Sequence, residues 1–278
     1  MAMKIIDGKT LSTKLRTELK SKIEEKGKIP GLAVVIVGND PASKIYVRNK
    51  IKACEEVGIR SYSYELSETV TQAEVENLLD ELAINSEIDG ILLQLPLPKG
   101  FDSESAMSHI PVEKDVDGFS AENLGLLTLG KEKIAACTPS GIMKLLENEG
   151  IEIAGKHAVV LGRSDTVGKP MAMLLLNANA TVTICHSKTR NLKEVCKTAD
   201  ILVSAVGKPK FVTKDMVKEG AVVIDVGMNR DENGKLCGDV DFENVKDVSS
   251  FITPVPGGVG PMTITMLMYN TCFAAFKE

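Results

Sequence analysis

Short apolar runs alternate along this chain with longer segments of helical periodicity, and this alternation most restricts its fold. The runs 32–37 and 90–95 are apolar at nearly every position, whereas 43–57 and 71–83 have helical spacing. Strands that are apolar on both faces are typical of a parallel sheet covered by helices. With a further strand at 61–66, the first half predicts a βαβαβ order, whose ligands lie at the carboxyl ends of the strands.

The same alternation returns in the second half of the chain. Four runs typical of strands are separated by segments long enough for crossover helices, at 157–161, 181–185, 201–205 and 221–226. The polar passage 99–139, which contains glycine and proline, is typical of a connection between two halves. A length of 278 residues and 44% hydrophobic content suffice for two cores, so we expect a two-domain α/β protein.

Composition excludes several classes of function. The net charge of −5 comes from interspersed acids and bases, which is unlike the basic stripe of a nucleic-acid-binding surface. We found no apolar run of membrane-spanning length and no signal peptide, so we expect a cytoplasmic protein without a membrane partner. The six cysteines are scattered and the three histidines lack metal-ligand spacing, which predicts free thiols and no metal site.

The turn after the run 157–161 is the first candidate site. A buried strand enters Gly162, Arg163 and Ser164, and the chain leaves into an apolar helix at 171–176. Glycine allows close backbone approach, and a helix N-terminus offers free N–H groups to a phosphate. The segment departs from the G-x-G-x-x-G pattern, so an ordinary strand-to-helix connection remains an alternative.

The end of the next strand favours NADP over NAD. An NAD enzyme places Asp or Glu there to bind the ribose hydroxyls, whereas this chain has Ser187, Lys188 and Arg190. Together with Arg163, these side chains suit a ribose 2′-phosphate.

In the first half, four polar residues stand at positions where a ligand could bind. Tyr46 and Lys50 are four residues apart and share one helix face, Gln94 ends a strand, and Asp117 precedes a glycine. Each position also has a structural interpretation. Tyr46 and Lys50 could lie on a solvated helix face, Gln94 could satisfy the backbone at a strand end, and Asp117 could belong to an ordinary turn.

Seven segments, taken in order, resemble the methylenetetrahydrofolate dehydrogenase/cyclohydrolase family. They are VGNDPASKIYVRNK at 37–50, QLPLP at 94–98, KDVDGF at 114–119, TPSG at 138–141, GRS with VGKP at 162–170, HSKT at 186–189 and PVPGGVGPMT at 254–263. The resemblance covers nearly the whole chain. It implies an enzyme of one-carbon metabolism that oxidises methylenetetrahydrofolate with NADP and hydrolyses the methenyl product to 10-formyltetrahydrofolate.

The resemblance also implies an architecture. Residues 1–138 would form an N-terminal α/β substrate domain, and residues 139–261 a C-terminal Rossmann-like NADP domain, with the folate in a cleft between them. The last helix, 262–278, would pack back on the first domain. The protein would be a homodimer.

Finally, the resemblance implies roles for individual residues. Tyr46 would stack on the folate, Lys50 would be catalytic with Gln94 supporting it, Asp117 would hold the pterin, and Gly258 would contact the substrate. The NADP site would be lined by Gly162, Arg163, Ser164, Ser187 and Met228. Two residues depart from the family pattern, Thr166 and Met228, and both concern cofactor contacts.

Two alternatives to this function stay open. One is a dehydrogenase that lacks the hydrolytic step or acts on another small cyclic substrate, which Lys50 argues against. The other is a non-catalytic NADP-sensing module, which would need only the second half of the chain.

Overall fold

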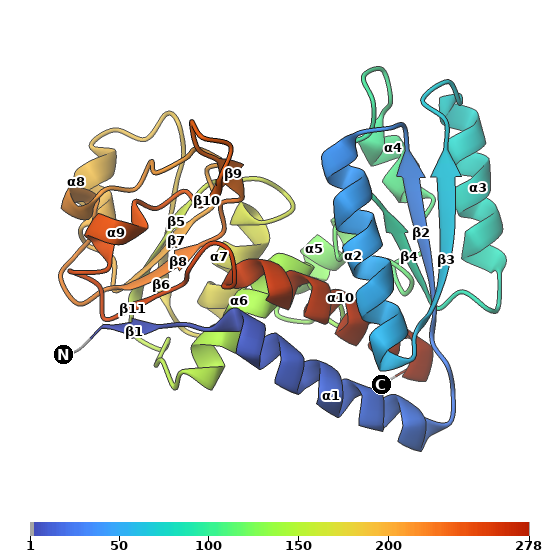
Figure 1. Cartoon of the computed structure of the whole chain (residues 1–278), viewed down its shortest axis with the longest axis horizontal. Coiled ribbons are helices and arrows are strands. Elements are labelled where there is room, and N and C mark those ends of the chain that lie inside the picture. The colour runs from blue at the N-terminus through green and yellow to red at the C-terminus, as the bar shows by residue number, and fades with distance from the viewer. Residues whose placement is uncertain (1–2, 278) are drawn as a thin grey trace. The chain divides into compact units, whose positions relative to one another are not determined.

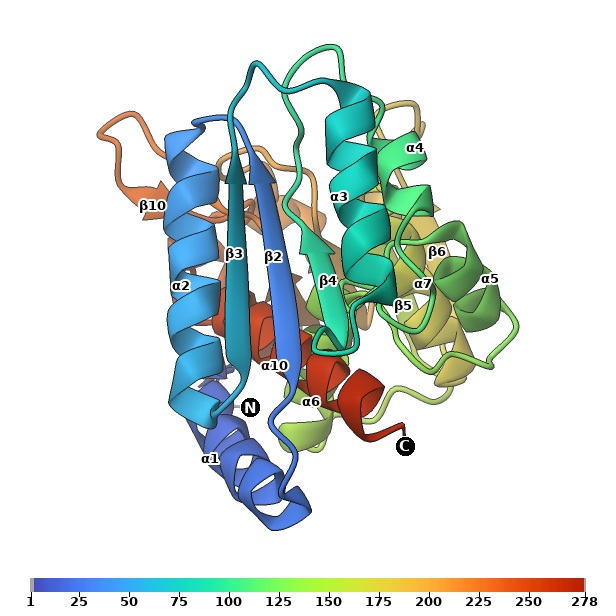
Figure 2. The same cartoon turned by 90° about the vertical axis from the view of Figure 1, so that its right-hand side faces the viewer.

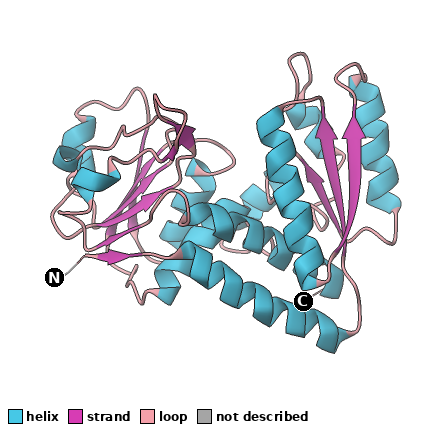
Figure 3. Ribbon diagram, in the orientation of Figure 1, coloured by secondary structure: helices cyan, strands magenta, loops and turns pink. Residues whose placement is uncertain are grey.

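The computed structural model describes residues 3–277, whose helices and strands are drawn in Figure 3. These residues form two compact units. We call residues 14–137 with 264–277 the three-stranded unit, and residues 3–13 with 138–263 the six-stranded unit. Each unit is an α/β structure built on a parallel sheet, as predicted.

The three-stranded unit is built on β2 (Gly31–Val37), β3 (Arg60–Leu66) and β4 (Gly90–Leu93), in the order β3-β2-β4. Figure 2 shows these strands side by side with helices on their flanks. β2 is buried along its whole length because it is the central strand. The predicted strands are therefore confirmed, although β4 ends at Leu93 and leaves Gln94 beyond it.

Helices cover both faces of this small sheet. α2 (Pro41–Val57) contacts β2 and β3, whereas α3 (Gln72–Ile84) and α4 (Ser103–Ser108) share a core with alternate residues of β2. The passage 99–139 is not the plain connection we expected, because it contains α4 and α5 (Ala121–Thr128). Both helices are short and capped by a side chain, so hydrophobic periodicity gave no signal for them.

The start of α2 also differs from the prediction. We expected Ser43 as the N-cap, but the cap is Asp40, whose carboxylate accepts a hydrogen bond of 2.7 Å from the Ser43 N–H. Pro41 occupies the first turn, where its missing N–H leaves no bond unmade. Asp40 therefore fixes the first turn of the helix that carries Tyr46 and Lys50.

The six-stranded unit has the strand order β1-β11-β8-β7-β5-β6, and all these strands are parallel. The four predicted strands are confirmed to within one residue at each end: β5 (His157–Leu161), β6 (Thr181–Cys185), β7 (Ile201–Ser204) and β8 (Val222–Asp225). β11 (Phe251–Ile252) and β1 (Lys4–Ile5) extend the sheet beyond β8.

The position of β1 differs from the domain boundaries we expected. Residues 1–138 were assigned to one domain, but Lys4 and Ile5 pair with Phe251 and Ile252 of the six-stranded unit. A strand of two residues carries no periodic signal, and its partner lies almost the whole chain away. The divisions between the units fall within α1 (Gly8–Lys26), near the start of α6 (Cys137–Asn148) and within α10 (Val259–Phe276).

Helices lie on both sides of the larger sheet. Figure 1 shows α8 (Leu192–Cys196) and α9 (Phe242–Val245) on one side and α7 (Gly168–Asn177) on the other. The remaining elements are the 3₁₀ turn η1 (Lys214–Met216) and the hairpin of β9 (Asn229–Arg230) and β10 (Leu236–Cys237). Five of the six free cysteines are buried, and Cys237 is partly exposed. Among the described helices, none has the length and apolar character needed to cross a membrane.

Candidate active site and nucleotide end

Lys50 is the centre of a polar cluster in the three-stranded unit. Its side chain, from α2, is buried with 5% of its surface exposed. The Lys50 Nζ donates a hydrogen bond of 3.3 Å to the Gln94 Oε1 and lies 4.9 Å from the centre of the Tyr46 ring. The solvated-lysine alternative is therefore wrong, because a buried amine requires such partners.

Gln94 is held in one orientation. Its backbone N–H continues the sheet by donating to the Val35 carbonyl at 2.8 Å. Its side-chain Nε2 donates to the Leu95 carbonyl at 2.6 Å, which leaves the Oε1 as the acceptor for Lys50. An amide fixed in this way can orient an amine, so Gln94 has more than a backbone-satisfying role.

Asp117 belongs to the same electrostatic environment. Burial raises the pKa of its carboxyl group, and the positive charge of Lys50 opposes that rise. Burial also raises the pKa of Tyr46, with the charge of Asp117 adding to the effect. The sequence-predicted residues Tyr46, Lys50, Gln94 and Asp117 are thus brought together around one buried amine, which can hold, donate or accept a proton.

The loop that carries Asp117 is fixed by Asp115, a residue that we did not single out from the sequence. The buried Asp115 carboxylate accepts hydrogen bonds from the N–H groups of Gly118 at 3.0 Å and Ser120 at 2.8 Å. The Asn123 side chain donates to it at 2.9 Å. The Asp-x-Asp-Gly pattern indicated a turn, but not which aspartate would face inward.

Asn270 on α10 is a second residue that the sequence analysis missed. Its Nδ2 donates to the carbonyls of Val116 at 2.9 Å and Ala135 at 3.1 Å. The thiol of Cys137 also donates to the Val116 carbonyl, at 3.3 Å, and burial raises the pKa of this thiol. A single asparagine in an apolar helix gave no signal, because its partners are backbone groups distant in sequence.

In the six-stranded unit, the turn after β5 is closed tightly at Gly162. The φ angle of Gly162 is +122°, and a Cβ there would lie 2.4 Å from the Ala205 carbonyl oxygen. A residue with a side chain therefore cannot replace it without displacing the backbone. The Ser164 Oγ accepts from the N–H groups of Val167 at 3.2 Å and Gly168 at 3.3 Å, which ties the turn to the first residue of α7.

A cavity of about 280 Å³ opens beside this turn, at the carboxyl ends of β5, β6 and β7. Leu192 and Phe211 contribute apolar surface, and its polar lining includes Arg163, Ser187 and Lys208. An apolar pocket edged by two cations and a hydroxyl fits the adenosine and 2′-phosphate part of NADP. Of the residues proposed for that phosphate, Lys188 and Arg190 are not part of the lining, whereas Lys208, which we did not propose for it, is.

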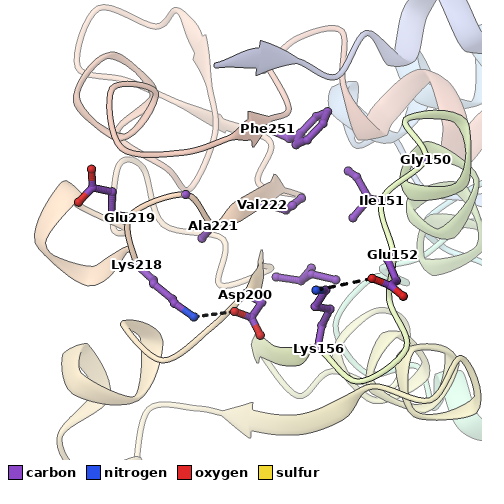
Figure 4. Close-up of a pocket in the computed structure, with 12 residues that line it drawn as sticks. Gly150, Ile151, Glu152, Lys156, Asp200, Lys218, Glu219, Ala221, Val222 and Phe251 are labelled. Carbon is purple, nitrogen blue, oxygen red and sulfur yellow. Dashed lines mark hydrogen bonds and ion pairs between the residues drawn. The ribbon is translucent and has the colours of Figure 1, made fainter. Parts of the chain in front are cut away.

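A second cavity in this unit, of about 430 Å³, lies at the opposite end of the sheet (Figure 4). It is lined by residues at the amino ends of β7 and β8. Its lysines are already paired, Lys156 with Glu152 at 3.7 Å and Lys218 with Asp200 at 2.6 Å. Ligands of parallel sheets bind at the carboxyl ends, so the smaller cavity is the candidate nucleotide site.

The two remaining predicted residues lie elsewhere in the six-stranded unit. Met228 follows β8 and is 56% exposed, so it is available to a ligand. Gly258 is buried just before α10, where a Cβ would lie 2.6 Å from the Pro254 carbonyl oxygen. Gly258 is therefore not in the unit that contains the Lys50 cluster.

Comparison with known proteins gives a family match for each half of the chain. Residues 6–117 match the tetrahydrofolate dehydrogenase/cyclohydrolase catalytic domain, and residues 136–278 match the NAD(P)-binding domain of the same family. The chain belongs to this family. A curated relative, bifunctional protein FolD of Caldicellulosiruptor saccharolyticus, is 60% identical over 275 residues, which cover 96% of this chain and 99% of the relative.

Solved structures of the family have the same fold. The bifunctional FolD of Campylobacter jejuni matches with a TM-score of 0.97 and 50% identity, covering 99% of both chains. The Trypanosoma brucei FolD, solved with NADP cofactor and inhibitor, matches with a TM-score of 0.95 and 39% identity over 100% of this chain and 98% of that one. The resemblance found in the sequence motifs is thus confirmed over the whole chain.

Proposed function

We propose that this chain oxidises methylenetetrahydrofolate with NADP⁺, hydrolyses the methenyl product to 10-formyltetrahydrofolate, and uses Lys50 as the catalytic group of the hydrolytic step. The observation that carries the proposal is the buried Lys50 amine, hydrogen-bonded to Gln94 and set against Tyr46. Family membership supports both activities.

For the oxidation, the chain positions two reactants. NADP⁺ supplies the hydride acceptor when it is bound. Gly162 lets the backbone approach closely, and Arg163 and Ser187 line the cavity beside it. Ser164 and Met228 complete the proposed cofactor site. Holding the donor carbon against the acceptor can account for most of the rate, since no protein acid or base is required.

The hydrolysis requires proton transfer, because water adds to the methenyl bridge and one carbon–nitrogen bond then breaks. The Lys50 amine, when neutral, accepts a proton from the attacking water and can return it to the leaving nitrogen. Gln94 keeps that amine pointed in one direction. In this proposal Tyr46 stacks on the folate, Asp117 binds the pterin, and Gly258 contacts the substrate.

The proposal assigns NADP to the six-stranded unit and the folate to the three-stranded unit, apart from the substrate contact proposed for Gly258. The cavity beside Gly162 supports the first assignment, and the Lys50 cluster supports the second. We also propose that the protein is a cytoplasmic homodimer, as the family resemblance implies. Light scattering of the purified chain tests the dimer, which predicts a mass twice the 29.9 kDa of one chain.

One assay tests both activities. Purified protein is incubated with methylenetetrahydrofolate and either NADP⁺ or NAD⁺, while reduced cofactor and methenyl intermediate are followed separately. We expect faster reduction of NADP⁺ than of NAD⁺, with little methenyl product accumulating. Accumulation of the methenyl compound would identify a dehydrogenase without hydrolytic activity. No reduction of either cofactor would refute the proposal.

A further inference from the structure

Two aspartates lie almost without solvent exposure at the carboxyl end of the six-stranded sheet. Asp225, the last residue of β8, is 3% exposed, and Asp239, shortly before α9, is 0% exposed. A carboxylate removed from water needs other hydrogen-bond donors. Here most of the donors are backbone N–H groups of the loops around the two side chains, so these carboxylates connect separate segments of the chain.

Asp239 binds the loop that follows β7 and the segment that follows β8. Its Oδ2 accepts from the N–H groups of Val206 at 2.7 Å and Gly207 at 3.2 Å, and its Oδ1 accepts from Lys208 at 2.9 Å. The Asn229 Nδ2 donates to the same Oδ1 at 2.8 Å. One side chain therefore fixes three consecutive amides and links them to a neighbouring strand end.

Asp225 in turn fixes the backbone of Asp239. The Asp225 Oδ1 accepts from the N–H groups of Asp239 and Gly227, both at 2.9 Å. Its Oδ2 accepts from the Val240 N–H at 2.9 Å. The two carboxylates thus act in series, since Asp225 sets the position from which Asp239 reaches the loops.

Glycine is required where the chain passes these carboxylates. A Cβ on Gly238 would lie 1.8 Å from the Asp225 Oδ2, and a Cβ on Gly227 would lie 2.3 Å from the Asp239 Oδ1. Neither distance is compatible with a side chain. The close approach shows that both carboxylates are integral to the packing of these loops.

Val206 and Lys208, held by Asp239, line the cavity that also contains Arg163 and Ser187. We propose that Asp239 is a positioning residue for NADP, which keeps the loop after β7 in the shape that the cofactor requires, with Asp225 as its support. This inference rests on the proposed function, because it assumes that NADP occupies this cavity. Asp239 acts through the loop and does not touch the reacting atoms.

The test compares Asp239→Asn with Asp241→Asn. Asparagine keeps the volume but turns one acceptor oxygen into an NH₂ group, which leaves loop amides unpaired. Asp241 is the matched control, because its carboxylate accepts a hydrogen bond from the Asn244 side chain and, in the described part of the chain, none from the loop after β7. We expect the NADP⁺ dissociation constant of Asp239→Asn, measured by calorimetry, to rise about tenfold or more.

Two further measurements distinguish a local effect on the loop after β7 from a general loss of structure. Hydrogen exchange of the Val206, Gly207 and Lys208 amides in the cofactor-free protein should accelerate in Asp239→Asn and stay unchanged in Asp241→Asn. Hydrolysis of the methenyl substrate, assayed without cofactor, should stay within about twofold of wild type, because the Lys50 cluster is in the other unit.

A folded Asp239→Asn protein with unchanged NADP⁺ affinity would overturn the inference, and so would an equal loss of both activities. If Asp239→Asn does not fold, Asn229→Ala decides, since it removes only the side-chain donor at 2.8 Å. We expect its NADP⁺ dissociation constant to rise about threefold, and an unchanged constant would overturn the inference. Wild-type protein that fails to bind NADP⁺ would instead refute the proposed function.

Discussion

Functional groups are held in place by different means in the Lys50 cluster and at the nucleotide end, by which we mean the carboxyl ends of β5, β6 and β7 around Gly162. Around Lys50, side chains contact side chains: an amine, an amide and an aromatic ring from α2 and the end of β4. At the nucleotide end, backbone groups are held by glycine and by buried carboxylates. Substitutions should therefore abolish chemistry at the first region, but alter binding and stability at the second.

The comparison is tested most strongly by Lys50→Met. Methionine fills a similar volume but has no amine, so we expect hydrolysis of the methenyl substrate to fall by about 1,000-fold. The NADP⁺-dependent oxidation should persist within about tenfold, because it needs no protein acid or base. Both rates are measured on the same purified sample, with Lys52→Met, an exposed lysine of the same helix, as the control. Retained hydrolysis in Lys50→Met would contradict the catalytic assignment.

The acids of the two regions should also differ in how pH affects them. Burial raises the pKa of both acids. At Asp117 the charge of Lys50 opposes the rise, whereas at Asp225 burial raises the pKa from 3.8 to about 6 and the charge of Asp239 adds to the effect. Between these values the folded chain retains a proton that the unfolded chain releases. The free energy of unfolding should therefore fall as pH rises from about 4 to about 6, by up to about 3 kcal/mol, and then level off.

Urea unfolding of wild type and Asp225→Asn at several pH values measures this effect. The variant loses the titrating group, so the difference in stability between the two proteins should change across the same window. Asp225→Asn is expected to be less stable at neutral pH, because one of its acceptor oxygens is lost. A difference that is constant from pH 4 to 7 would show that Asp225 does not titrate there.

Much of the fold could be predicted from the sequence because buried parallel strands are continuous apolar runs. β5 is such a run and was located to the residue. The more exposed β6 was also located to the residue, because its β-branched residues are typical of a strand. β1 could not be located, because two residues carry no period and the pairing with β11 is a tertiary contact. The N-cap of α2 was missed because Asn39, Asp40 and Pro41 are equally typical of a free turn.

In the candidate site, too, some residues could be predicted from the sequence and others could not. Tyr46 and Lys50 were identifiable because a spacing of four residues places them on one helix face, and the family motifs then drew attention to them. The supporting residues Asp115, Asp239 and Asn270 bind backbone groups, and such groups have no signature in sequence. Side-chain chemistry could therefore be predicted, whereas the contacts that orient it required the structure.

A smaller effect is expected when the nucleotide turn itself is changed. In Gly162→Ala the new Cβ would meet the Ala205 carbonyl oxygen at 2.4 Å, so the turn must shift and we expect NADP⁺-dependent oxidation to fall about 100-fold. Gly155→Ala is the matched control, because Gly155 also has a positive φ of +74° but no atom within 4 Å of a Cβ. Initial rates of NADP⁺ reduction measure the effect, with calorimetric titration of NADP⁺ alongside, and equal rates and affinities of the two variants would count against a phosphate-binding turn.

The smallest effect concerns the choice of cofactor and compares two arginines of the same unit. Arg163 lines the cavity with Ser187 and Lys208, whereas Arg190 does not. Replacing Arg163 with methionine removes a charge-assisted contact to the 2′-phosphate, so kcat/KM for NADP⁺ should fall about 30-fold. The value for NAD⁺, which lacks that phosphate, should change by less than about threefold. Arg190→Met should leave both values nearly unchanged, and a larger loss in Arg190→Met than in Arg163→Met would move the phosphate site to the end of β6. Lys208 remains in both variants, so we expect Arg163→Met to keep a residual preference for NADP⁺. The size of that preference measures the contribution of the loop held by Asp239, which carries Lys208.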